Sequence, residues 1–520
     1  MYENELRLIK AIEENNALKV LNLIEKGVDL NFIYENGETP LMLSIKEHNF
    51  EIFKILLDAG ADISIKDEES YNALLIACEN TCYKMVNCLI NKGADVNTKN
   101  EKGQTPLMLA SKYNGLKVCK LLIENGADIT ETDRDGRTAL IYSAQTWYIE
   151  IIEYLLKNGS DVTIQDQGGI GWTPLMYAVE NSYLKSTIKD LEIENPEDIK
   201  VLNILLEYGA DPNKNDYEGT TPLMIACDMN IRKEILSRLI EAGADVNKSR
   251  ANDLKSPLLI GIENHISIDS LQLFIDMGAD VNHQDIKGYT ALMIAVESNK
   301  KKYVEILLNN GADVNIKNKE GKTALMMNVD KENLGLIKRL IEEGADPSIK
   351  DKNGWTVLNH IFDNFKLSLD YRIKVLEFFI DMGVDINSQD KDRRTILMYN
   401  VWGNFGLAKK TIEKMLKLGA DINILDNEGN SILIYAGCLK TIEFLVNKGA
   451  KVNVKNKKGD TPLIYFIKDN NYDKVDILID LGADINIKNN EGKTAIKVAA
   501  EKGYEEIVKL LSDAGAKLTD

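Results

Sequence analysis

The chain has 520 residues, 44% of them apolar, and its 81 acidic residues exceed its 63 Lys and Arg, which gives a net charge of -18 at pH 7. This acidic balance disfavours nucleic acid and anionic membranes as partners, because both require a basic surface. No apolar run approaches the roughly 20 residues of a membrane helix, and residues 1–5 do not begin a secretory signal, so we expect a cytoplasmic protein.

A Gly-Ala-Asp triplet, or a close variant of it, recurs fifteen times along the chain. Most intervals are 33 residues, and the triplets begin at Gly27, Gly60, Gly93, Gly126, Gly159, Gly209, Gly243, Gly278, Gly311, Gly344, Gly383, Gly419, Gly449, Gly482 and Gly515. A period of this length is typical of stacked supersecondary units. We therefore expect each unit to contact its neighbours only, and function to lie on an extended surface.

Residues 133–166 illustrate the fold that we expect for one unit. The segment 133–136 ends in Gly136 and predicts a tight turn, after which Thr138 can cap a short helix. Apolar residues at helical spacing over 149–156 predict a second helix. Gly159 is placed to end that helix in the left-handed conformation.

A Pro follows the cap residue in six repeats, at the first helical position that tolerates it best: Pro40, Pro106, Pro174, Pro222, Pro257 and Pro462. The pattern Thr-Pro-Leu-x-x-Ala, with its 33-residue period, resembles the ankyrin repeat over essentially the whole chain. The Thr-Pro-Leu-Met variant is similar to bacterial ankyrin proteins. Met stands where that family has a hydrogen-bonding His, so we expect apolar packing there instead. The resemblance implies an all-α solenoid of helix-turn-helix units with protruding β-turn tips.

We expect one domain over residues 1–520, with an N-terminal capping repeat at 1–33, internal repeats over 34–487 and a C-terminal capping repeat at 488–520. Polar residues in the first helix and Ser512 in the last repeat favour capped ends. The period is longer near residues 184–199 and 365–372, where either longer helices or a protruding loop would absorb the insertion. The repeat between Ser431 and Thr461 is shorter by three residues.

Motifs for chemistry are weak. Gly321-Lys322-Thr323 lacks the first Gly of a phosphate-binding loop. Cys78, Cys82 and Cys88 lack a fourth zinc ligand at suitable spacing. The four histidines pair with no Ser or Cys in a recurring context. We therefore expect no enzymatic activity, no cofactor and no metal.

The resemblance implies that partners bind across the turn tips and the adjacent face of the first helices. The tip residue just before the cap is aromatic in four repeats: Tyr71, Trp172, Tyr289 and Trp355. Each ring is either an interface anchor or folded against a neighbouring turn. Seven residues after the cap, acidic side chains recur at Glu79, Glu180, Asp228, Glu297, Asp330 and Asp363. They form either a solvated face or a site for a basic peptide.

These features predict a non-enzymatic scaffold that binds a protein or peptide, with a basic partner as the sharper hypothesis. The resemblance supplies this role by analogy of fold. The competing hypothesis is an effector, exported without a signal, that acts by binding a protein of a host. We expect a monomer in either case.

Overall fold

The computed structural model describes residues 2–188, 197–328, 332–364, 366–402 and 405–517. Regular structure within these ranges is helical, apart from one isolated antiparallel bridge between Gln389 and Thr395. The chain divides into two compact units, Met1–Asp280 and Val281–Asp520. Within each unit, pairs of antiparallel helices follow one another with a turn before each pair, so the predicted all-α solenoid is confirmed.

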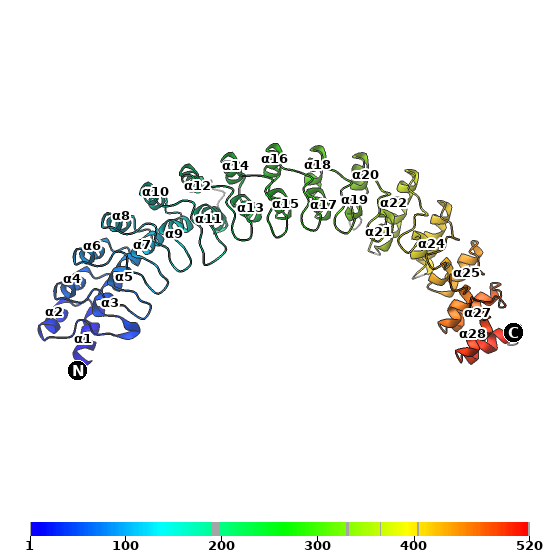
Figure 1. Ribbon diagram of the computed structural model, residues 1–520, viewed down its shortest axis with the longest axis horizontal. Helices are drawn as coiled ribbons and strands as arrows, with labels where there is room; N and C mark the ends of the chain where they lie inside the picture. Colours follow the sequence, from blue (N-terminus) through cyan, green and yellow to red (C-terminus); the bar gives the residue numbers. More distant parts are fainter. Residues whose placement is uncertain (1, 189–196, 329–331, 365, 403–404, 518–520) are drawn as a thin grey trace. The chain divides into compact units, whose positions relative to one another are not determined.

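In the unit Met1–Asp280, a first and a second helix alternate along the chain (Figure 1). The first helices are α1 (Tyr2–Glu13), α3 (Pro40–Lys46), α5 (Ala73–Glu79), α7 (Pro106–Lys112), α9 (Ala139–Thr146), α11 (Pro174–Ile188), α13 (Pro222–Asp228) and α15 (Pro257–Glu263). The second helices are α2 (Ala17–Glu25), α4 (Phe50–Asp58), α6 (Tyr83–Asn91), α8 (Leu116–Glu124), α10 (Ile149–Lys157), α12 (Glu197–Glu207), α14 (Lys233–Glu241) and α16 (Ile268–Asp276).

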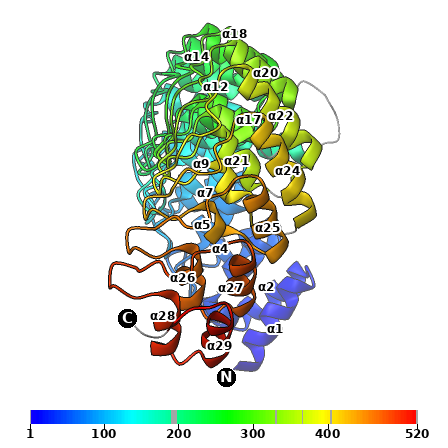
Figure 2. The ribbon, with the colours of Figure 1, turned by 90° about the vertical axis from the view of Figure 1, so that its right-hand side faces the viewer.

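The unit Val281–Asp520 repeats this plan. Its first helices are α17 (Ala291–Glu297), α19 (Ala324–Met327), α21 (Val357–Asp363), α23 (Ile396–Tyr399), the 3-10 helix η3 (Ile432–Tyr435), α26 (Pro462–Lys468) and α28 (Ala495–Glu501). Its second helices are α18 (Lys301–Asn309), α20 (Leu334–Glu342), α22 (Leu369–Asp381), α24 (Phe405–Lys417), α25 (Leu439–Asn447), α27 (Tyr472–Asp480) and α29 (Glu505–Asp513). The last turns project on the side of α26 and α28, away from α27 and α29 (Figure 2).

A capping Thr sets the start of the first helix. The hydroxyl of Thr105 accepts the backbone N–H of Met108 at 3.3 Å, and Pro106 takes the first helical position. The sulfur of Met108 accepts the backbone N–H of Thr105 in return, at 3.4 Å. The same sulfur contact occurs at Met42 and Met176. These methionines are buried as expected, but they also retain a weak hydrogen bond at the position of the family's His.

A glycine in the left-handed conformation ends the second helix. Gly126 has φ 89°, which an L side chain adopts at a cost. Its N–H bonds to the carbonyl of Ile123 at 3.1 Å, and the N–H of Ala127 bonds to the carbonyl of Leu122 at 3.0 Å. The paired bonds satisfy carbonyls at the end of α8 and turn the chain outward.

Asn side chains after the Gly-Ala-Asp triplet join successive repeats. Asn97 donates its Nδ2 to the carbonyl of Gly126 at 3.2 Å, and its Oδ1 accepts the backbone N–H of Asp128 at 2.8 Å. Each amide thereby serves one acceptor and one donor of the following repeat. The same pair of bonds recurs at Asn213, Asn247, Asn282, Asn315, Asn387 and Asn423.

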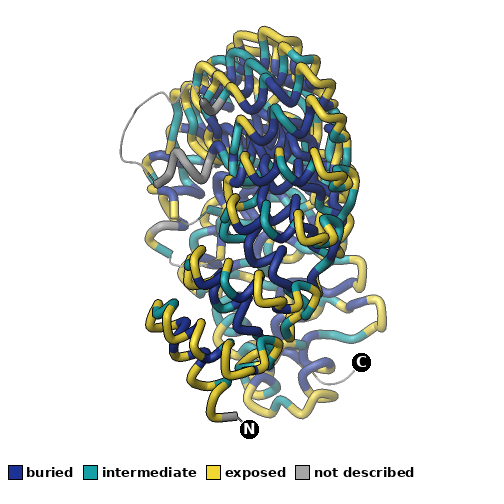
Figure 3. Tube along the Cα trace, turned by 90° about the vertical axis from the view of Figure 1, so that its left-hand side faces the viewer, coloured by how far each residue is buried: buried dark blue, intermediate teal, exposed yellow. Residues whose placement is uncertain are grey.

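Buried aliphatic residues fill the space between the helices of a repeat and between repeats. The Leu two residues after the cap is at most 1% exposed in α3, α5, α7, α9 and α13, at Leu41, Leu74, Leu107, Leu140 and Leu223. Burying one such side chain contributes about 1.5–3 kcal/mol. Figure 3 shows the buried positions along the middle of the first unit and the exposed positions at turns and outer surfaces.

The irregular repeats absorb their length changes mainly in the helices. The insertion expected at 365–372 lengthens α22 to 13 residues, against nine in most second helices. Near 184–199, α11 extends to Ile188 and α12 begins at Glu197, and residues 189–196 of that insertion lie outside the described chain. In the short repeat, the first helix is reduced to the 3-10 turn η3.

Candidate protein-binding surface

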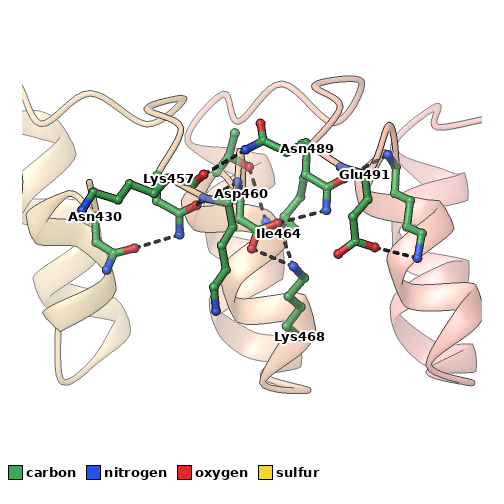
Figure 4. A network of polar contacts seen from close by, with 12 residues as sticks. Asn430, Lys457, Asp460, Ile464, Lys468, Asn489 and Glu491 are labelled. Atoms are coloured by element: carbon green, nitrogen blue, oxygen red, sulfur yellow. Dashed lines mark hydrogen bonds and ion pairs between the residues drawn. The ribbon is translucent and has the colours of Figure 1, made fainter. Parts of the chain in front are cut away.

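Two positions in each repeat lie next to one another on the face of the first helices. The tip position is the residue just before the cap, and the inner position is the residue eight places later. In four repeats, side chains of opposite charge at these positions form an ion pair of 2.6–2.7 Å: Glu38–Lys46, Lys255–Glu263, Asp460–Lys468 and Lys493–Glu501. Figure 4 shows how Lys468 reaches Asp460, which also accepts a hydrogen bond from Asn489.

The repeats with an aromatic tip lack this internal ion pair. Their tip and inner residues are Tyr71 and Glu79, Trp172 and Glu180, Tyr289 and Glu297, and Trp355 and Asp363. No cation in the described part of the chain lies within ion-pair distance of these four carboxylates. These repeats therefore combine an aromatic tip with a carboxylate that has no ion pair within the described residues.

Electrostatic coupling between ring and carboxylate follows from this placement. Burial raises the pKa of the Tyr71 hydroxyl to about 12, and the charge of Glu79 adds to the shift. Burial and then the charge of Glu297 raise the pKa of Tyr289 in the same way. The part of each shift that comes from the carboxylate reflects a negative charge near the hydroxyl, which favours a cation there.

The ring of Trp172 differs from the other tips. It is only 9% exposed, because its Nε1 donates to Asp216 at 3.3 Å and the ring makes a T-shaped contact with Tyr177 at a centroid distance of 5.2 Å. Of the two alternatives for a tip ring, Trp172 adopts the second, because it is folded against the next turn. Tyr71, Tyr289 and Trp355 are half-buried.

The remaining predicted acids differ in their settings. Asp228 is exposed and accepts a hydrogen bond from Asn264 at 3.0 Å. Glu180 is half-buried, and burial raises the pKa of its carboxyl. Asp330 lies outside the described residues. Glu79, Glu180 and Asp228 belong to the first unit, whereas Glu297 and Asp363 belong to the second.

A buried carboxylate supports an aromatic or imidazole side chain in several first helices. Tyr142 donates to Asp133 at 2.6 Å, and Tyr435 donates to Asp426 at 2.5 Å. Tyr177 and Tyr399 make the equivalent bonds to Asp166 and Asp390, and His360 lies 3.0 Å from Asp351. The same carboxylates accept backbone N–H groups of their turns, so each one ties a first helix to its turn.

One arginine in each unit lies between two of these tyrosines. Arg394 donates its Nε to the hydroxyl of Tyr435 at 3.1 Å. Burial lowers the pKa of Arg394, but hydrogen bonds with the hydroxyls of Tyr399 and Tyr435 outweigh burial and raise it. In the first unit, burial lowers the pKa of Arg137, but the neighbouring Tyr177 and Tyr142 outweigh burial and raise it. The guanidinium of Arg394 is thus held by a side chain of the next repeat, whereas Nε of Arg137 is buried without a hydrogen-bond partner among the described residues.

Trp402 is the aromatic residue that the sequence analysis missed. It is 70% exposed and occupies the inner position of the repeat whose tip is Arg394. Together with Arg394, Met398, Tyr399 and Tyr435 it lines a pocket of about 350 Å³. Its place eight residues after the tip is the signal that could have identified it, since that position holds acids in the aromatic-tip repeats.

Two further pockets lie in the first unit and are more polar. One of about 540 Å³ surrounds Tyr71 and Glu79 and is also lined by Lys46, Lys102 and Lys112. The other, of about 660 Å³, is lined by Arg137 and Tyr142 together with Lys102, Arg134 and several acids. Both follow the turn tips, so they belong to the same face as the tip and inner positions.

The described residues contain no group of three or more His, Cys, Asp or Glu side chains arranged to hold a metal ion. All six cysteines have free thiols. In the part of the chain that the structure covers, none of the helices has the length and apolar content needed to span a bilayer.

Tandem helix pairs joined by an Asn ladder, with turns projecting beside the first helices, define a helical-repeat solenoid. The chain belongs to the ankyrin-repeat family: a family model described as ankyrin repeats (3 copies) matches it in overlapping windows from residues 8–100 to 435–520. Human protein fem-1 homolog A is 34% identical over 85 residues, which are 16% of this chain and 12% of the human protein. The bovine protein fem-1 homolog A is also 34% identical over 85 residues, or 16% of this chain and 13% of that protein. The matched stretch thus spans about an eighth of these relatives.

Proposed function

We propose that the chain is a non-enzymatic scaffold that binds a protein or peptide with its turn tips and the adjacent face of its first helices. The bound segment is basic where it meets an aromatic tip. One observation carries this proposal: the repeats with aromatic tips leave the carboxylate at the inner position without an internal cation. Ankyrin repeats are a general protein-interaction module, which supports the class of partner.

A partner's Lys or Arg gains two interactions at such a repeat. The cation can lie against the ring, which contributes about 0.5–1 kcal/mol at an exposed site. It also pairs with the carboxylate, which contributes up to about 1 kcal/mol. At Lys255–Glu263 or Lys493–Glu501 the same partner would first have to displace the chain's own lysine. The repeats of Tyr289 and Trp355, whose rings are half-buried rather than folded away, therefore favour basic side chains.

We further propose that the protein acts as a monomer in the cytoplasm. Free thiols at all six cysteines suit a reducing compartment. Three of these cysteines, Cys78, Cys119 and Cys227, are buried, and burial raises the pKa of each thiol. A protonated, buried thiol is unreactive, which fits a structural role for these residues.

Two double variants test the basic-partner proposal. Glu297→Gln with Asp363→Asn removes two unpaired carboxylates at inner positions of aromatic-tip repeats. Glu263→Gln with Glu501→Gln removes the same number of charges at the same positions, but where a tip lysine already neutralises them. Proteins retained by the wild-type chain from native lysate are purified, and their affinities are then measured at several salt concentrations.

We expect the first double variant to bind its partner about threefold to tenfold more weakly at low salt, because each lost ion pair contributes about 0.2–1 kcal/mol. Its affinity should also depend less on salt than that of the wild type. The second double variant should bind like the wild type. Equal losses in both variants, or a wild-type affinity that does not change with salt, would contradict the proposal.

A further inference from the structure

The repeat that contains α23 inverts the arrangement seen at the aromatic tips. Its tip carries a cation, Arg394, and its inner position carries an aromatic ring, Trp402. The two side chains line one pocket of about 350 Å³ with Met398, Tyr399 and Tyr435. An indole that is 70% exposed over such a pocket is the kind of side chain that dominates binding energy in protein interfaces.

One cation lines this pocket, and three carboxylates lie around it. Arg394 is the one ionised side chain among the five residues that line it. The nearby carboxylates of Asp390 and Asp426 are at most 8% exposed and accept hydrogen bonds from Tyr399 and Tyr435. A third carboxylate, Asp392, is about half exposed and lies 3.7 Å from Nη1 of Arg394. Arg394 is therefore the charged group of the lining that a ligand can meet, and it suits an anion.

The guanidinium of Arg394 is ordered by its neighbours and keeps donors that can bind an anion. Its Nε is bonded to the hydroxyl of Tyr435, and its carbon lies 5.4 Å from the centre of that ring. A guanidinium carries five N–H donors, so these contacts leave donors for a carboxylate. Arginine binds carboxylates with charge-assisted and frequently bidentate hydrogen bonds. Because Arg394 is already ordered, little side-chain entropy is lost when it binds.

We propose that this pocket binds the C-terminal residue of a partner chain, with the α-carboxylate on Arg394 and an apolar side chain against Trp402, Tyr399 and Met398. The inference deepens the proposed function and rests on it only in taking the occupant to be part of a protein.

The size of the pocket favours a chain end over an internal acidic residue. A volume of about 350 Å³ lies at the small end of ligand pockets, which range over about 300–1,000 Å³. A C-terminal residue carries its carboxylate and its side chain on the same Cα, so both reach the cation and the apolar floor within that volume. An internal acidic residue needs a neighbouring residue for the apolar contact, and its chain must leave the pocket in two directions.

Two peptide libraries test the proposal. One consists of random decapeptides with a free C-terminal carboxylate, and the other of the same sequences with an amidated C-terminus. Binding of the full chain to each library selects sequences, whose affinities are measured by fluorescence anisotropy. We expect selected peptides to end in an apolar residue and to bind about tenfold or more weakly when amidated, since a hydrogen-bonded charge is lost.

Three variants locate the site. Arg394→Gln removes the charge, and Trp402→Ala removes an exposed ring whose loss leaves the core intact. Arg137→Gln is the matched control, because Arg137 also lies between two tyrosines but lines a different and more polar pocket. We expect Arg394→Gln and Trp402→Ala each to weaken the selected peptides about tenfold or more, and Arg137→Gln to leave them unchanged.

Equal binding of acid and amide peptides, selection of basic side chains at the pocket, or equal effects of Arg394→Gln and Arg137→Gln would overturn the assignment. The basic-partner proposal is tested separately by the carboxylate variants at residues 297 and 363. If those variants bind a basic partner more weakly while the peptide libraries show no preference for a carboxylate, only the proposal of a C-terminal residue in the pocket is rejected. If the libraries select a free C-terminal carboxylate but the carboxylate variants bind like the wild type, the pocket proposal is supported and the basic-partner proposal is rejected.

Discussion

Glu263 and Glu297 occupy the same position in their repeats, yet only Glu263 has a cation beside it. The difference arises eight residues earlier, where the tip is Lys255 in one repeat and Tyr289 in the other. A carboxylate that is paired within its own repeat has little left to offer a partner, whereas an unpaired one does. At the scale of single residues, the identity of the tip therefore decides which charges of this surface are available for binding.

His360 gives a prediction about pH at the same scale. It lies 3.0 Å from the buried carboxylate of Asp351 and packs against Trp355. Burial lowers the pKa of His360 more than the charge of Asp351 raises it, so the net shift is downward. Folding then favours the neutral imidazole. The stability that results is present above the unfolded pKa of about 6.5 and is lost as the pH falls through the lower folded pKa.

We therefore expect the melting temperature of the wild-type chain to fall between pH 7.5 and 5.5. His360→Gln, which has no imidazole to protonate, should show a smaller decrease over the same range. Differential scanning calorimetry of both proteins at matched ionic strength measures the effect. Parallel pH profiles would show that the imidazole does not titrate differently in the folded and unfolded chains.

At the scale of secondary structure, each first helix is short and depends on its N-terminal cap. Most have about seven residues, which is too short for a stable isolated helix in water. Capping and burial against neighbours must supply the rest. The cap contact is missing at Thr323 and at Thr494, and the helices that follow have four and seven residues.

The cap contact predicts a local effect of Thr105→Ala. The hydroxyl of Thr105 accepts the N–H of Met108, and losing such a cap costs about 1 kcal/mol. Hydrogen exchange over 106–112 should therefore become about fivefold faster. Thr323→Ala is the matched control, because Thr323 occupies the same position without the side-chain contact. Acceleration of similar size around residue 323 would mean that the hydroxyl contact is not the cause.

At the scale of the whole molecule, the contacts are between neighbours in sequence. The Asn ladder joins neighbouring repeats at several places within each unit, and the turns pack in the same order. Stability in such an array is approximately a sum of repeat and interface terms. A local defect should accordingly weaken its own repeat and the adjoining ones, without a direct effect on distant repeats.

Substitutions at Gly354 and Gly383 distinguish two causes of a local defect, which are backbone strain and a clash with the next turn. Both have positive φ, 79° and 85°, so Ala is strained at either position by about 1–2 kcal/mol. A Cβ on Gly354 would also lie 2.7 Å from the backbone nitrogen of Lys391 in the next turn, whereas one on Gly383 meets no atom within 4 Å.

We expect Gly354→Ala to speed hydrogen exchange in its own turn and over 385–395. Gly383→Ala should cost less, and neither variant should alter exchange over 40–130. Equal effects of the two substitutions would show that contact between turns adds nothing.

Much of this architecture was predictable because it rests on local rules. The helix period, the capping Thr, the Pro at the first helical position and the Gly that ends each second helix act within a few residues of one another. Exposure of the aromatic side chains on the face of the first helices was not predictable from such local rules. The tip pattern pointed to Trp172, whose ring is buried, and not to Trp402, whose ring is exposed.

The sequence by itself determined the repeat, its helices and the positions that could form a surface. Only the tertiary structure decided which of those side chains are exposed and which charges are neutralised. The reason is distance along the chain: Trp172 is covered by Asp216, 44 residues away, and Arg394 is held by Tyr435, 41 residues away. Contacts of that kind depend on how one repeat stacks on the next, which no pattern within a single repeat specifies.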